Sequence, residues 1–98
     1  MSDDKIPLVT REDLANEYDD LLLIDGFDEA FIGTAERCTL PPVAVYDRDK
    51  LVEKLVADGS SYEDAQSYID YNITGAWVGD RTPLVLSRAR LTAEDKED

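Results

Sequence analysis

The chain has 98 residues, 43% of them hydrophobic, which is enough for one small domain with a single core. Its 23 acidic residues outnumber its 10 basic residues and leave a net charge of −13 at neutral pH. A surface of this charge repels phosphate backbones and anionic lipids, so we expect no direct contact with nucleic acid or with a membrane, and a basic protein is the complementary partner.

The first half of the chain predicts one short helix followed by a set of strands. Thr10 has the residue type of an N-cap and precedes a predicted helix over residues 11–18, whose first turn is acidic as the helix dipole favours. Three segments then have the short apolar pattern of strands: residues 21–24, 30–37 and 43–46. Gly33 predicts a bulge or a close approach in the second strand, and Pro41 and Pro42 should interrupt the pattern before the third.

The second half of the chain predicts a helical hairpin. Asp47 can cap a helix over residues 48–57, which has an apolar stripe at helical spacing and ends at Gly59, a residue suited to the left-handed conformation after a helix. A second helix is expected over residues 62–73, because serines and acidic residues at capping-box spacing open it, and Gly75 can end it. These two helices should pack against each other.

A last strand is expected at residues 84–88. Strands and helices are therefore segregated along the chain, which predicts an α+β fold: a small antiparallel sheet of three to four strands with helices packed on one face. We expect residues 1–9 to form a loose start, residues 10–90 a single domain, and residues 91–98 a disordered acidic tail. No signal peptide or membrane-spanning run is visible, so a cytoplasmic location is expected.

The residue types that most often perform catalysis are scarce. The chain has no histidine, which removes the commonest general base and metal ligand, and no catalytic residue or cofactor is predicted. Its one cysteine, Cys38, follows Arg37, which could lower the pKa of the thiol if the two side chains met. No base or second cysteine accompanies it, so a semi-buried structural cysteine is the simpler interpretation.

An acidic cluster offers the one metal-binding hypothesis. The carboxylates of Asp25, Asp28 and Glu29 could gather around calcium or magnesium, with Arg37 or Arg81 as a clamp for an anion. The spacing lacks the alternation of an EF-hand loop, however, so an acidic turn is the simpler interpretation of these residues.

Aromatic and acidic residues are dense between residues 60 and 79. On the predicted helix, Glu63, Asp70 and Tyr71 point away from the expected core, an arrangement that suits protein recognition. Trp77 lies between two glycines and has two interpretations: an exposed binding residue, or a side chain that fills the core between helix and last strand. The apolar neighbours of Trp77 favour the second.

Three stretches carry a resemblance to a known family: DGFDEAFIG, VAVYDRDKLVEKLV and SYEDAQSYIDYNITGAWVGDRTPLVL. In this order they resemble a family of small uncharacterised proteins encoded by tailed phages and bacteria, and the similarity spans residues 25–86. The resemblance implies a phage-related genomic setting and no catalytic residues.

The leading hypothesis is therefore a small acidic, non-enzymatic interaction protein, in one form a phage-encoded modulator or inhibitor of a host protein, which could be basic or nucleic-acid-binding. A sharper form is DNA mimicry, in which carboxylates take the places of phosphates. The alternatives are a metal-dependent small enzyme or metal-binding module that uses Asp25, Asp28 and Glu29, a structural or assembly subunit that forms homo-oligomers, or acidity that reflects only a salty cytoplasm. The candidate partner-binding residues are Glu63, Asp70, Tyr71, Trp77, Asp25 and Asp28.

Overall fold

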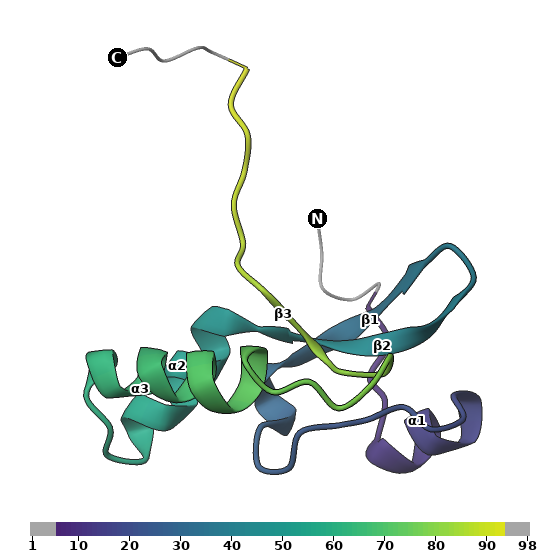
Figure 1. Cartoon of the computed structure of the whole chain (residues 1–98), viewed down its shortest axis with the longest axis horizontal. Helices are drawn as coiled ribbons and strands as arrows, with labels where there is room; N and C mark the ends of the chain where they lie inside the picture. Colours follow the sequence, from purple (N-terminus) through teal and green to yellow (C-terminus); the bar gives the residue numbers. More distant parts are fainter. Residues whose placement is uncertain (1–5, 94–98) are drawn as a thin grey trace.

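A computed structural model describes residues 6–93. The chain forms short helices and one small sheet (Figure 1). In chain order they are α1 (Arg11–Glu17), the 3₁₀ turn η2 (Asp28–Ala30), β1 (Phe31–Arg37), β2 (Leu40–Asp47), α2 (Arg48–Ala57), α3 (Tyr62–Ile69), the π turn η3 (Asp70–Thr74) and β3 (Leu84–Leu86). The predicted α+β class is confirmed.

The sheet has three strands in the order β1-β2-β3, and it is mixed rather than antiparallel. β1 and β2 form an antiparallel hairpin, whereas β3 lies parallel to β2, with Val45 opposite Leu84 and Asp47 opposite Leu86. The prediction of an antiparallel sheet is thus wrong for β3. The chain leaves β2 through α2 and α3 and returns to run beside the last three residues of β2, which is the long crossover that a parallel pair requires.

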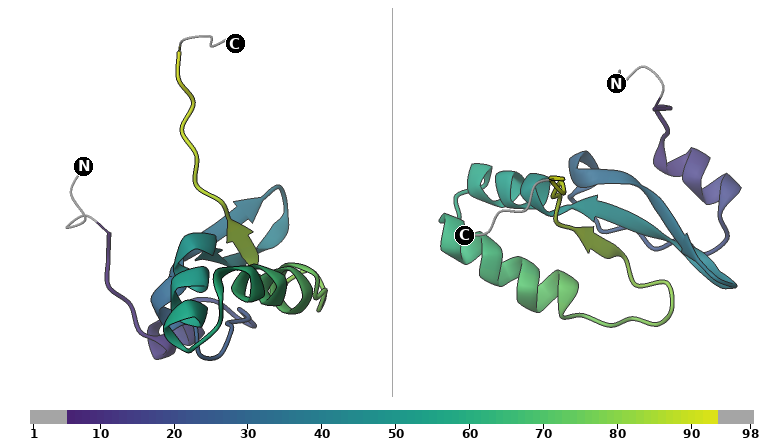
Figure 2. Two further views of the ribbon diagram at one scale, coloured as in Figure 1. Left: turned by 90° about the vertical axis from the view of Figure 1, so that its left-hand side faces the viewer. Right: turned by 90° about the horizontal axis from the view of Figure 1, so that it is seen from above.

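The core is formed by side chains of β2, α2 and α3 together with the turns η2 and η3. Ala44 and Tyr46 alternate onto the same face of β2 and are fully buried. α2 and α3 run side by side (Figure 2), and both contribute side chains to this core. The buried cluster consists of Phe27, Ala30, Ala44, Tyr46, Leu51, Val52, Leu55, Ala65, Ile69 and Ile73. Whether all helices cover one face of the sheet stays a prediction.

The helix starts follow the capping residues in the sequence. Thr10 and Asp13 form a reciprocal capping box at α1, and the Asp47 carboxylate accepts a hydrogen bond from the Asp49 N–H at 3.0 Å at α2. α2 has the predicted bounds, and Gly59 follows it with a φ of 114°. Local hydrogen bonding therefore fixes these boundaries, as predicted.

Residues 21–24 are buried in part but do not form a strand, so this prediction is wrong. Leu21, Leu23 and Ile24 pack against the core cluster. The backbone N–H of Ile24 donates to the hydroxyl of Tyr46 at 2.8 Å instead of joining a ladder. An apolar run indicates burial, and this run is buried against side chains instead of another strand.

In the hairpin, β2 is longer than predicted and β1 is irregular. The register of β1 shifts between Phe31 and Gly33, which is consistent with the predicted bulge. β2 includes Pro41 and Pro42, although they were expected to break the pattern. β3 pairs with only the last three residues of β2, so the prolines lie where one edge of that strand has no ladder to interrupt.

Both ends of the described chain are exposed. Residues 87–93 continue from β3 as an extended segment that leads away from the helices and sheet (Figure 1). The expected loose start and acidic tail fall partly on residues 1–5 and 94–98, which lie outside the described residues. Within residues 6–93, no helix is long and apolar enough to cross a membrane.

Candidate functional site

A groove of about 340 Å³ opens between three segments that are distant in the sequence. One wall is the apolar run of residues 21–24, the second is the π turn η3, and the third is the loop of residues 76–83 that leads into β3. The lining is mostly apolar and consists of Leu22, Leu23, Ile24, Asn72, Ile73, Ala76, Val78, Thr82 and Pro83. Its size and character are those of a site for a few side chains of a partner.

The first wall is held by a buried tyrosine. Tyr46 is fully buried in β2, and its hydroxyl accepts the N–H of Ile24 at 2.8 Å. Burial raises the pKa of the Tyr46 hydroxyl, so this group stays neutral and available as an acceptor at physiological pH. The groove wall is therefore tied to the centre of the sheet.

The third wall contains a tight hydrogen-bonded turn. The hydroxyl of Thr82 accepts the N–H of Val78 at 2.9 Å and donates to the carbonyl of Gly79 at 2.6 Å. Gly79 has a φ of 107°, which other residues rarely adopt. Arg81 donates to the carbonyl of Asp19 and so links this turn to the chain before the first wall. Arg81 is therefore already engaged and is poorly placed to act as an anion clamp.

The second wall departs from the predicted helix. α3 ends at Ile69, and residues 70–74 form a π turn, so the α-helix predicted to residue 73 is shorter than expected. Gly75 closes this turn: a Cβ atom there would lie 2.5 Å from the carbonyl oxygen of Asp70. The wide turn directs Ile73 into the core and leaves Tyr71 and Asn72 exposed, an arrangement that requires glycine at position 75.

Aromatic side chains stand exposed beside the groove. Trp77 is 74% exposed and Tyr71 is 80% exposed, so the interpretation of Trp77 as a core residue is wrong. Ile73 belongs to the core instead, and Ala76 and Val78, the chain neighbours of Trp77, line the groove. Exposed aromatics of this size are more typical of binding surfaces than of a surface without a partner.

The segments that form the groove are flanked by carboxylates. Each lining segment has at least one exposed aspartate beside it in the sequence, and the set is Asp19, Asp20, Asp25, Asp70 and Asp80. Arg81 is the one basic residue within these same segments. These aspartates, which we call the acidic rim, adjoin the lining segments in the sequence; Asp25 and Asp70 among them are paired with Arg11 and Arg48.

The predicted partner-binding residues divide between two places. Asp70 and Tyr71 belong to η3, whose next two residues, Asn72 and Ile73, line the groove. Arg48 pairs with Asp70 at 2.8 Å and also donates to the side chain of Gln66, so this carboxylate is held toward α2. Glu63 is exposed in the first turn of α3, two helical turns before Asp70, and is not part of the groove lining.

The acidic cluster is organised around an arginine rather than a metal site. Arg11 Nη2 lies 2.8 Å from Asp28 and 3.4 Å from Asp25. The hydrogen bond from Arg11 holds the pKa of Asp28 below its usual value. Glu29 points elsewhere, and within residues 6–93 no group of three or more candidate ligands is arranged for a metal ion.

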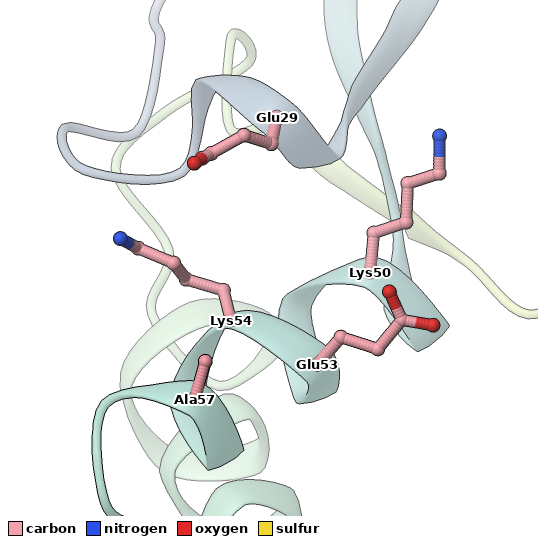
Figure 3. Close-up of a pocket in the computed structure, with 5 residues that line it drawn as sticks. All are labelled: Glu29, Lys50, Glu53, Lys54 and Ala57. Carbon is pink, nitrogen blue, oxygen red and sulfur yellow. The ribbon is translucent and has the colours of Figure 1, made fainter.

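Glu29 lines a second pocket of about 370 Å³ against α2. Glu29 and Lys54 extend toward the same side of it, whereas Lys50 and Glu53 project toward the other (Figure 3). The opposite charges alternate around this shallow pocket, so it has no excess of either sign that would select a ligand.

Cys38 lies at the tip of the β1–β2 hairpin. It is exposed and has a φ of 52°, so the expectation of a semi-buried cysteine is wrong. Arg37 is exposed beside it at the end of β1. The hairpin tip is short and turned outward, which leaves the thiol in solvent.

Sequence reasoning missed the residues that assemble the groove. Tyr46 and Arg11 each bind partners more than ten positions away, and no local pattern predicts such pairs. Two features of the sequence could have indicated the groove. They are the apolar run of residues 21–24 and the hydrophobic Val78, each of which is adjacent to turn residues. A scan against protein-family models, a search of curated proteins and a search of solved structures found no match to this chain.

Proposed function

We propose that the protein is a non-enzymatic interaction module that binds a cationic segment of a partner protein in the groove between residues 21–24, η3 and residues 76–83. The observation that supports this most directly is an apolar groove whose lining residues adjoin, in the sequence, the exposed side chains of Trp77 (74%) and Tyr71 (80%). A partner that covers these rings and fills the groove would remove a large apolar area from water.

The charge of the site specifies the partner's chemistry. The apolar lining takes aliphatic or aromatic anchors, and the aspartates at its rim favour lysine or arginine beside those anchors. The net charge of −13 adds long-range attraction for a basic partner, which speeds association at low salt. The expected ligand is therefore an extended segment with one or two apolar residues among basic ones.

The resemblance to small phage proteins motivates a host protein as the partner. An inhibitor would compete for a basic, apolar-anchored surface of that protein. The DNA-mimic form of the proposal needs carboxylates alone to carry the binding, whereas the groove form needs the apolar lining as well. The two forms therefore differ in how they respond to loss of the groove.

The test is a titration with three synthetic peptides of equal length. The first alternates arginine with leucine, the second replaces leucine with serine, and the third replaces arginine with glutamate. Only the first should bind and shift the fluorescence of Trp77, the one tryptophan of the chain, to shorter wavelength. Equal binding of the first two peptides would instead support the DNA-mimic form.

A pair of matched variants locates the binding. Val78→Asp places a charge in the groove lining at a residue that is 61% exposed, and it should weaken binding about tenfold or more. Val56→Asp makes the same change on α2, at a residue that is 43% exposed and outside the groove, and it should leave the affinity unchanged. Equal loss in both variants, or in neither, would contradict the groove as the site.

A further inference from the structure

The charge of the chain is divided unevenly. Residues 81–93 contain three arginines and no acidic residue, the longest acid-free run in the sequence. Since the whole chain has a charge of −13, the remainder has a charge of −16 and this segment +3. A cationic segment is thus covalently joined to an acidic body.

The distal part of this segment projects from the molecule. Arg88 lies 3.2 Å from Asp47 and 3.8 Å from Asp49, which fixes the base of the segment next to α2. Beyond it the chain extends away from the body (Figures 1 and 2), and the side chain of Leu91 is fully exposed at 101%. We call residues 87–93 the arm.

The arm has the chemistry that the groove accepts. Arg90 and Leu91 place a guanidinium next to an aliphatic anchor, and the apolar segments that line the groove have exposed aspartates next to them in the sequence. We propose that two copies of this chain exchange arms, so that Leu91 of each copy lies in the groove of the other and Arg90 faces the acidic rim. This inference rests on the proposed function of the groove.

The geometry favours a second copy as the occupant. Pro83 lines the groove immediately before β3, and the arm leaves the far end of β3 in a direction away from the body (Figure 1). Seven extended residues reach about 23 Å, which is enough to bridge two small domains in contact. Reciprocal exchange makes two identical contacts about a twofold axis and closes the assembly as a dimer.

The mass of the full-length chain in solution tests this proposal. Sedimentation velocity over a concentration series should show a dimer in at least one of two salt conditions. The first is about 0.15 M, where the Debye length is about 8 Å, and the second is about 1 M, where it is about 3 Å. The second condition is included because repulsion between two copies of charge −13 opposes contact at low salt. A monomer at every concentration in both conditions would overturn the proposal.

Two surface variants distinguish arm exchange from other contacts. Leu91→Asp removes the anchor and Val78→Asp blocks the groove; both side chains are exposed, so folding should be unaffected. Each variant alone should weaken the dimer about tenfold or more, whereas Val56→Asp should not. An equimolar mixture of the two variants should form heterodimers more readily than either alone forms dimers, because one intact arm then meets one intact groove.

The outcomes separate this inference from the function on which it rests. If the chain is a monomer but the arginine–leucine peptide still binds the groove, arm exchange is wrong and the proposed function stands. If neither the peptide nor a second copy binds, both are wrong. A dimer that persists in both variants would show a different interface, such as pairing along the open edge of β3, and would also overturn arm exchange.

Discussion

α2 and α1 are attached to the rest of the molecule by different forces. α2 buries Leu51, Val52 and Leu55 in the central core. α1 buries only Leu14. Its polar contacts with the rest of the molecule are the hydrogen bond from Arg11 to Asp28 and, from the C-cap residue Tyr18, a hydroxyl 3.4 Å from that of Thr34. One helix is held by apolar burial, the other mainly by exposed charged and polar groups.

This difference divides the molecule into a stable part and an adjustable part. Apolar burial resists salt and moderate changes of pH, whereas exposed ion pairs are weakened by both. The groove lies at the boundary, because one wall is η3 and another is the segment that follows α1. A ligand in the groove would therefore contact both parts.

The largest effect should come from the core of the stable part. Leu51→Ala removes a fully buried side chain and should lower the free energy of unfolding by about 2–5 kcal/mol, measured by urea denaturation. Leu8→Ala changes a residue that is 99% exposed and is the control. A cost for Leu51→Ala no larger than that of Leu8→Ala would refute the core described above.

A smaller effect is expected at the link between the two parts. Tyr46→Phe keeps the ring and removes the hydroxyl that accepts the N–H of Ile24, which should cost about 1–3 kcal/mol. Hydrogen exchange should become faster at residues 21–24 while α2 keeps its protection.

The pH dependence of stability provides a control for Tyr46. Because burial raises the pKa of Tyr46 in the folded state, its contribution is fully present below the ordinary tyrosine pKa of 10.0 and is lost as the pH rises through the raised value. Tyr46→Phe should reduce this loss at high pH. An unchanged pH profile would show that the other tyrosines account for it.

The π turn should be sensitive to a single methyl group. Gly75→Ala places a Cβ 2.5 Å from the Asp70 carbonyl and should cost about 1–3 kcal/mol while weakening peptide binding to the groove. Gly59→Ala strains a left-handed residue at the α2–α3 turn, where space is open, so it should lower stability without altering the groove. Equal peptide affinity in both variants would argue against a role of η3 in binding.

The smallest global effect is expected for the exposed ion pair. Arg11→Gln removes the partner of Asp25 and Asp28 and should leave the unfolding midpoint almost unchanged, while hydrogen exchange in α1 becomes faster. High salt should reproduce part of this change in the wild-type chain. If α2 loses protection as much as α1 does, the division into two parts is wrong.

The sequence predicts the local features of this fold well. Thr10, Asp47 and Gly59 act through hydrogen bonds and backbone geometry within a few residues, so the positions of α1 and α2 follow from them. These interactions do not depend on the rest of the fold.

The features that were missed depend on distant segments. The direction of β3 follows from the path of the chain through α2 and α3, which apolar periodicity does not encode. The burial of residues 21–24 without a strand depends on Tyr46, and the exposure of Trp77 depends on the π turn before it. The groove depends on the path into β3, on residues 21–24 and on the π turn. The sequence therefore indicates its residues individually but does not predict that they meet.

The parallel pairing of β2 with β3 has a consequence for the order of folding. The β1–β2 and α2–α3 hairpins join neighbouring segments, whereas Val45 and Leu84 are about 40 positions apart, so closing that pair is the slow step. Pro83 and the loop before it reach their places only when β3 docks, which makes the groove the last part of the molecule to form. A ligand of the groove should therefore slow unfolding, since it binds only the chain that has completed this step.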